Sequence, residues 1–155
     1  MIKKFENFIN ENASNGIFPK KLQEHIEFII QSLKKSEDKD KNISAFFTST
    51  KDEERNEIKR MLEKELGDDL FIINKDIDST EDMEKTIEEN KGKVFYFTHF
   101  KSKEMLKVIC ATPLKHNCVI NICTTNEPEG KLWGEIFKER FTWICNISEL
   151  KDLWK

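Results

Sequence analysis

Short apolar runs alternate with longer amphipathic segments along most of this chain. From residue 43 onward, apolar runs rich in β-branched and aromatic residues recur every 23 to 27 residues, at 43–48, 70–74, 93–98, 118–124 and 141–147. Several of these runs are almost continuously apolar, which is typical of strands covered on both faces. The segments between them carry apolar residues at helical spacing, at 52–66, from 79 onward, at 101–111 and at 130–139. A closing helix is predicted from Ser148.

This alternation predicts the fold class. Strand–helix units of this length form right-handed βαβ crossovers and therefore a mostly parallel sheet with helices on both faces. We expect a three-layer α/β domain with a five-stranded, mostly parallel sheet and flanking helices. Local signals agree, since Gly67 follows the first of these helical segments and Ser79-Thr80 provides capping chemistry for the next one.

The first forty residues have a different pattern, which predicts a pair of helices. One face of a short N-terminal helix would carry Ile2, Phe5, Phe8 and Ile9. Pro19 suits the first turn of a second helix. The apolar face of that helix would be formed by Leu22, Ile26, Ile29, Ile30 and Leu33. A polar stretch, 34–42, follows, so we divide the chain into helices and linker (1–42) and a compact α/β domain (43–155). The apolar face of the second helix either covers the sheet or recruits a partner helix.

Composition excludes several classes of protein. The 155 residues include 26 Lys and Arg against 29 Asp and Glu, a formal net charge of −3, with 37% hydrophobic and 35% charged residues. This is ordinary for a globular domain and not for a disordered chain. No apolar run approaches the ~18 residues of a membrane span, and the N-terminus lacks the apolar region of a signal peptide, which predicts a cytoplasmic protein with no membrane partner. Only three basic residues are Arg, so nucleic-acid binding by this chain alone is not expected.

The cysteines and histidines do not predict a metal site or a catalytic centre. The four cysteines lie in or beside apolar runs: Cys110, Cys118, Cys123 and Cys145. We expect them to be reduced and to act as small buried hydrophobic residues. Cys118 and Cys123 are spaced just outside the zinc pattern and would face opposite sides of a strand. We expect His25 to be exposed on its helix, and we expect no cofactor.

The most specific motif is Thr124-Thr125-Asn126-Glu127-Pro128, followed fourteen residues after Asn126 by Arg140-Phe141. This strand-end asparagine, helix and Arg-Phe pair resembles the sensor-1 to arginine-finger stretch of AAA+ ATPases. The resemblance implies that Asn126 would orient water near a γ-phosphate and that Arg140 would reach the nucleotide of a neighbouring subunit. The alternative is an ordinary Asx/Pro turn before a helix, with Arg140 a surface charge at the helix end.

Two elements of that family are missing from the sequence. The turn after the first strand, Thr48-Ser49-Thr50-Lys51, contains no glycine and is followed by three acidic residues, whereas a phosphate-binding loop needs glycines so that its N–H groups can surround the phosphates. The Asp-Glu pair that holds Mg²⁺ would fall at Thr98-His99. The resemblance therefore indicates a degenerate AAA+/P-loop-like domain without ATP hydrolysis.

Two other functions compete with this interpretation. Asp76-Ile77-Asp78-Ser79-Thr80 resembles the nucleophile motif of haloacid-dehalogenase-type phosphatases, which would make the chain a Mg²⁺-dependent enzyme using Asp76 and Asp78. Plain helix capping by the same segment is the alternative. The acidic residues at 52–54 resemble the pocket of response-regulator receivers, which would make it a pseudo-receiver without a phospho-accepting aspartate.

The sequence thus favours a non-catalytic protein-interaction module that serves as an adaptor, an inhibitor or an inactive subunit. The expected partner is a protein, either an ATPase or a second copy of this chain. Asn126 and Arg140 are the candidates for contributing to a partner's ATP site. Trp133, Phe137 and Trp154 are the interface candidates, because aromatic residues anchor interfaces. Packing in the core is the alternative use of these aromatic residues, and it is the one expected for most of them.

Overall fold

The computed structural model describes residues 17–34, 42–73, 79–98 and 103–154. Five parallel strands form one sheet in the order β2-β3-β4-β1-β5. The strands are β1 (Ser44–Ser49), β2 (Leu70–Ile72), β3 (Val94–Phe97), β4 (Cys118–Cys123) and β5 (Trp143–Asn146). The helices are α2 (Lys20–Lys34), α3 (Asp52–Leu66), α4 (Thr80–Glu89), α5 (Lys103–Ala111), α6 (Glu127–Phe137) and α7 (Ile147–Leu153), with short 3₁₀ turns at Gly67–Asp69 and Thr112–Leu114. The three-layer α/β prediction is confirmed, and every strand pair is parallel.

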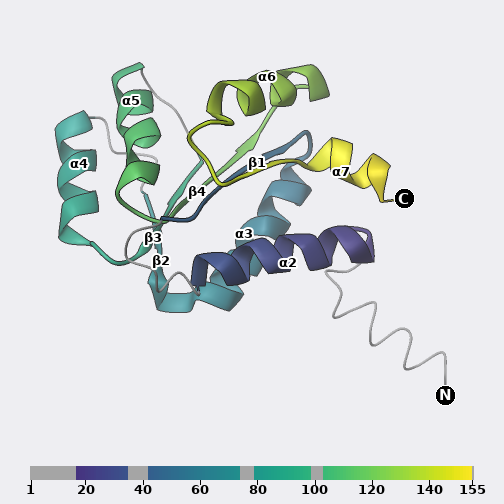
Figure 1. Cartoon of the computed structure of the whole chain (residues 1–155), viewed down its shortest axis with the longest axis horizontal. Coiled ribbons are helices and arrows are strands. Elements are labelled where there is room, and N and C mark those ends of the chain that lie inside the picture. Colours follow the sequence, from purple (N-terminus) through teal and green to yellow (C-terminus); the bar gives the residue numbers. More distant parts are fainter. Residues whose placement is uncertain (1–16, 35–41, 74–78, 99–102, 155) are drawn as a thin grey trace.

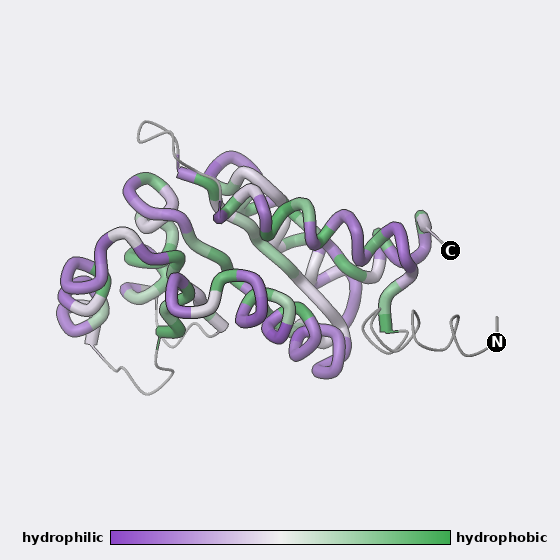
Figure 2. The backbone as a smooth tube through the Cα atoms, turned by 90° about the horizontal axis from the view of Figure 1, so that it is seen from below, coloured by the Kyte–Doolittle hydropathy of each residue, from purple (hydrophilic) through white to green (hydrophobic). Residues whose placement is uncertain are grey.

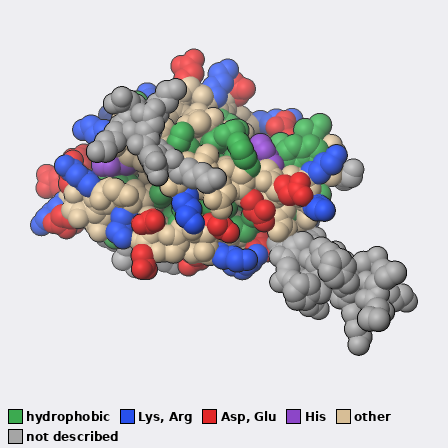
Figure 3. Space-filling model, turned by 60° about the horizontal axis from the view of Figure 1, so that its bottom comes forward, with side chains coloured by type: hydrophobic (Ala, Val, Ile, Leu, Met, Phe, Trp, Pro, Cys, Tyr) green, Lys and Arg blue, Asp and Glu red, His purple; other side chains and the backbone are tan. Residues whose placement is uncertain are grey.

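Alternate side chains of the strands enter two separate cores, one on each face of the sheet. Ala45 and Phe47 join α2, α3 and α7 in the first core, whereas Phe46 joins α4, α5 and α6 in the second. All six residues of β1 are buried, as a central strand between two layers of helices requires. Hydrophobic stretches accordingly run through the middle of the molecule in Figure 2, while charges of both signs are interspersed over the surface in Figure 3.

The helix α2 belongs to the first core and not to a separate unit. Its five apolar residues are at most 2% exposed and belong to the same buried cluster as residues of β1, β3, β4 and β5. It packs beside α3 across one face of the sheet (Figure 1). The described residues 17–34 therefore complete the α/β core. The predicted helix at residues 2–9 and the polar stretch 35–41 lie outside the described residues.

The element boundaries match the predicted ones with small differences. The helix α6 begins at Glu127 instead of residue 130, because Asn126 caps it and Pro128 fits its first turn. The strand β5 begins at Trp143 instead of residue 141, because Phe141 turns into the second core before the strand starts. Ser79 caps α4 by accepting a hydrogen bond from the Asp82 amide at 3.0 Å, as its sequence predicts.

Candidate functional site

The carboxyl ends of β1, β4 and β5 meet at one edge of the sheet, which we call the carboxyl edge. Ser49 is paired with Cys123, and Thr48 with Asn146, so the loops that follow these three strands lie side by side. Open α/β sheets bind their ligands at this edge, where neighbouring strands lead to helices on opposite faces. Here α3 and α7 leave toward one face and α6 toward the other. This edge is the candidate site of the protein.

Asn126 has a structural role at the carboxyl edge. Its Oδ1 accepts a hydrogen bond from the Glu129 amide at 3.0 Å, which caps α6. In return, Glu129 Oε2 accepts from the Thr125 amide at 2.8 Å, a reciprocal arrangement similar to a capping box. Thr124 fixes the approach to this turn, since its amide donates to the Ser49 carbonyl at 2.7 Å and its Oγ1 donates to the Asn126 carbonyl at 3.0 Å. The turn is therefore built as the Asx/Pro interpretation expects.

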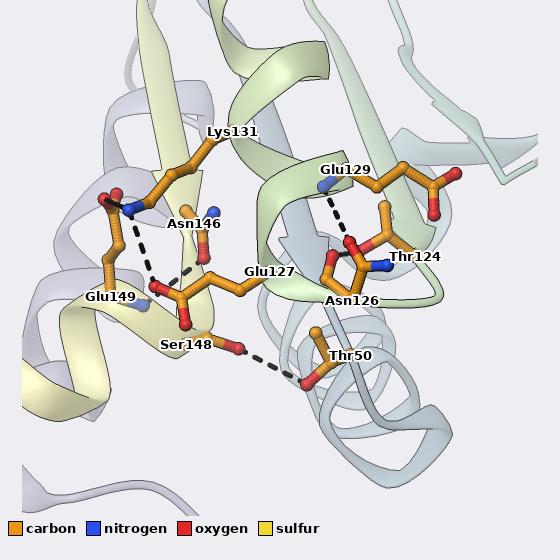
Figure 4. A network of polar contacts seen from close by, with 9 residues as sticks. All are labelled: Thr50, Thr124, Asn126, Glu127, Glu129, Lys131, Asn146, Ser148 and Glu149. Carbon is orange, nitrogen blue, oxygen red and sulfur yellow. Dashed lines mark hydrogen bonds and ion pairs between the residues drawn. The ribbon is translucent and has the colours of Figure 1, made fainter.

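A polar network joins the three loops of the carboxyl edge (Figure 4). Lys131 of α6 lies 3.2 Å from Glu149 of α7 and 3.8 Å from Glu127. Thr50, after β1, and Ser148 of α7 have their hydroxyl oxygens 3.3 Å apart. These contacts place the first turn of α7 against the loop that follows β1.

The start of α3 is the most strongly acidic part of this edge. Its first turn carries Asp52, Glu53 and Glu54, while the preceding Lys51 makes no side-chain cap. Glu54 is 2% exposed and lies 2.9 Å from the Nζ of Lys151, which is itself only partly buried. Carboxylates at a helix N-terminus offset its positive pole, and they repel any further anion.

The groups beside this helix start are also unsuited to reactive chemistry. Ser49 is 1% exposed, so its hydroxyl does not face the loop surface. Burial raises the pKa of the Cys123 thiol, and Asp52 beside it raises that pKa further. At neutral pH the thiol is held protonated, which removes it as a nucleophile. Thr98 follows β3 at the place expected for a metal-binding carboxylate, and His99 lies outside the described residues.

Arg140 lies at the other end of α6, away from Asn126. An eleven-residue helix separates the two, about 16 Å at 1.5 Å per residue. The Arg140 amide donates to the Phe137 carbonyl at 2.9 Å, and its side chain is exposed. Within the described residues its guanidinium takes part in no ion pair, whereas Arg55 pairs with Asp52 and Arg60 with Glu57. No carboxylate of the described residues therefore competes with an anion from outside for Arg140.

The three aromatic interface candidates are placed differently. Phe137 is fully buried in the second core, with its ring centroid 4.8 Å from that of Phe46, so it has no surface to offer a partner. Trp133 is half-buried and stacks on Phe137 at 5.7 Å. Trp154 is half-buried against His25, at 5.2 Å. The expectation that His25 is exposed is wrong, because it lies between Trp143 and Trp154, and this burial lowers its pKa.

The structure also exposes apolar side chains that the sequence did not single out. Leu132 and Ile136 of α6 are 62% and 53% exposed, and Phe28 of α2 is 62% exposed. Phe28 could have been recognised, because it falls outside the stripe of apolar positions that α2 buries.

Asp76 and Asp78, the residues of the phosphatase alternative, lie outside the described residues. In the part of the chain that is described, no group of three or more His, Cys, Asp or Glu side chains is placed to hold a metal ion. None of the described helices combines the length and hydropathy that crossing a bilayer requires.

No protein-family model and no curated protein matches this chain. The geometry of the carboxyl edge and the surface must therefore carry any functional conclusion.

A separate pocket of about 270 Å³ opens between α4 and α5. It is lined by Glu84, Ile87, Glu88, Val108, Ala111, Thr112, Lys115 and His116. Burial lowers the pKa of His116, whose ring meets the edge of Phe95 at 5.3 Å. Glu88 forms an ion pair at 2.8 Å with Lys91, which does not line the pocket. The pocket walls thus carry mixed charges that do not converge on one ligand group.

Proposed function

We propose that this chain is a non-catalytic protein-binding domain, a degenerate relative of AAA+ ATPases that acts as an adaptor, an inhibitor or an inactive subunit of an ATPase assembly. The observation that carries the proposal is the start of α3. There a glycine-free turn leads directly into Asp52, Glu53 and Glu54. A triphosphate at this position would meet carboxylates where an active relative offers backbone N–H groups and a lysine.

The order of the strands supports the resemblance to AAA+ domains. The resemblance places the sensor asparagine after the fourth strand and the arginine before the fifth. Here β1 lies between β4 and β5, and Asn126 follows β4. Receiver domains have the flavodoxin-like order 2-1-3-4-5, in which the first strand lies between the second and the third. In this chain β2 and β3 are neighbours, which weighs against the pseudo-receiver alternative.

Arg140 is the residue proposed to contribute to a partner. Its exposed guanidinium, unpaired within the described residues, could approach a phosphate bound to an adjoining subunit without first breaking an internal ion pair. A guanidinium contributes charge and a planar pair of donors, which a lysine cannot supply. Asn126 is less suited, because its Oδ1 is engaged in capping α6.

The first test measures nucleotide binding to the purified chain by calorimetry with MgATP. We expect no binding at physiological nucleotide concentration. Saturable binding that is lost on replacing Thr50 or Lys51 would overturn the proposal, because it would show that the acidic turn can hold phosphate.

The second test concerns Arg140 and needs the ATPase that co-purifies with this chain from its native cell. We expect R140A to change the ATPase rate of the assembly. K138A is the matched control, because Lys138 is also exposed after α6 but is engaged by Glu135 at 2.9 Å. Equal rates for the two variants would remove the role assigned to Arg140.

A further inference from the structure

A partly exposed aromatic surface lies where α2, β5 and α7 meet. We call it the aromatic patch and define it by His25, Phe28, Trp143 and Trp154. The ring of Trp143 meets His25 at 6.0 Å and Phe28 at 5.9 Å, and His25 meets Trp154 at 5.2 Å. Phe28 is 62% exposed although the buried face of α2 is at most 2% exposed. On the face that α2 covers, Figure 3 shows hydrophobic side chains gathered beside a histidine.

The patch borders an outer edge of the sheet. The strand β5 is the last in the order and is paired only with β1, so its other edge has no strand beside it among the described residues. Proteins commonly cover such edges with a helix or a loop, because unpaired edges invite aggregation. Leu153, next to Trp154 on α7, adds another apolar side chain that is 70% exposed. This surface has the character of one that another segment covers.

We propose that the N-terminal segment of this same chain, residues 1–16, covers the aromatic patch through the apolar side chains of Ile2, Phe5, Phe8 and Ile9. The spacing of these four residues places them on one face of a helix. A helix over residues 2–9 would be about 12 Å long. The proposal does not depend on nucleotide binding or on Arg140.

The attachment point of the segment lies close to the patch. Ile17 packs against the first core and Phe18 is 4% exposed, so the chain is anchored just before α2. His25 and Phe28 lie about 8 to 12 Å along the axis from the start of α2 at Lys20. The seven residues 10–16 can span up to about 25 Å when extended. The segment can therefore turn back and reach the patch.

Two further considerations favour this occupant over a second copy of the chain. A short tether gives an effective concentration on the order of millimolar, so even a weak contact within the chain is favoured over one between chains. The charges are also complementary, because Lys3 and Lys4 would approach α2, which exposes Glu24 and Glu27 around the patch. Contacts of this kind add little affinity but orient the segment.

The test uses the full-length chain with W133F, so that Trp143 and Trp154 are the remaining tryptophans. We expect F8E to raise the acrylamide quenching constant above that of the parent, because the rings of Trp143 and Trp154 become more exposed when the segment leaves the patch. N7E is the matched control, because it adds the same charge on the opposite face of the predicted helix. Its quenching constant should equal that of the parent.

Dilution identifies which chain supplies the segment. A quenching constant that is independent of protein concentration, with F8E above N7E, supports docking within one chain. A constant that rises on dilution together with loss of dimer would assign the patch to a second copy and overturn the proposal. Equal constants for F8E and N7E would also overturn it. As a folding check, both variants should keep the circular dichroism of the parent.

Discussion

Tyr96 is the single tyrosine of the chain and reports on the buried polar centre of the first core. Asn121, which is fully buried on β4, donates to the Tyr96 hydroxyl at 2.9 Å and to the Arg55 carbonyl at 3.0 Å. These bonds link β3, β4 and α3 through one amide. Burial is the main cause that raises the pKa of Tyr96 to about 12.

This shift predicts a loss of stability in alkali. Below pH 10 the phenol is neutral in both states and has no effect. Between pH 10 and 12 only the unfolded state ionises, so the free energy of unfolding falls by about 1.4 kcal/mol per pH unit. Tyrosinate absorbance should therefore appear only near pH 12 or together with unfolding seen by circular dichroism. Y96F is the control that lacks the signal. A titration near pH 10 in the folded protein would contradict the buried environment.

Lys151 is expected to matter more than its partly exposed position suggests. K151A would leave the carboxylate of Glu54 buried without its cation, and we expect a loss of about 1–3 kcal/mol, below that of a fully buried pair. K131A removes two exposed ion pairs and should cost less than about 1 kcal/mol. Urea denaturation of the two variants measures the difference. Equal losses would show that Glu54 is hydrated.

At the scale of elements, α6 approaches the sheet through two glycines in different surroundings. A Cβ on Gly130 would lie 3.1 Å from both Thr48 Oγ1 and Asn146 Nδ2, which are held between neighbouring strands. A Cβ on Gly134 would lie 3.1 Å from one methyl group of Ile144, which is on the edge strand and 37% exposed. Thr48 is 2% exposed, so the packed site around Gly130 has less room to adjust than the site around Gly134.

The two alanine variants should therefore change stability in opposite directions. Alanine gains about 1 kcal/mol over glycine inside a helix. For G134A we expect most of this gain, whereas G130A should lose about 1 kcal/mol net, because crowding in a packed site costs 1–3 kcal/mol. Thermal denaturation of both variants gives the signs. A stabilised G130A would mean that α6 can shift outward without cost.

The helices and strands could be predicted from the sequence because the residues that begin and end them lie close to each boundary. Gly67 ends α3 with φ 52° and Ser79 caps α4, each within one turn of the boundary. The burial of Phe137 follows from its position on α6, seven residues after Gly130 and four after Trp133, which places it on the inward face. The arrangement at the carboxyl edge could be anticipated only in part, because the contact of Thr50 with Ser148 depends on strand order, which no local pattern encodes.

At the scale of the whole molecule, α2 and the strands share one core, so the chain should unfold as one unit. I26A removes a fully buried side chain of α2, and we expect a loss of about 2–5 kcal/mol. Tryptophan fluorescence, which reports on β5, α6 and α7, should follow the same transition as far-ultraviolet circular dichroism. Two separated transitions would instead assign α2 to an independent unit.

The central place of β1 has a consequence for synthesis of the protein. Ser44, at its start, is hydrogen-bonded to Thr142, 98 residues later, and β4 is also distant along the chain. A ribosome thus releases Phe46 and Phe47 long before either neighbouring strand exists. During that interval a strand with no charged residue remains available to other nascent chains. Folding must wait until β5 has been made, so termination before Trp143 would leave an aggregation-prone fragment and not a smaller domain.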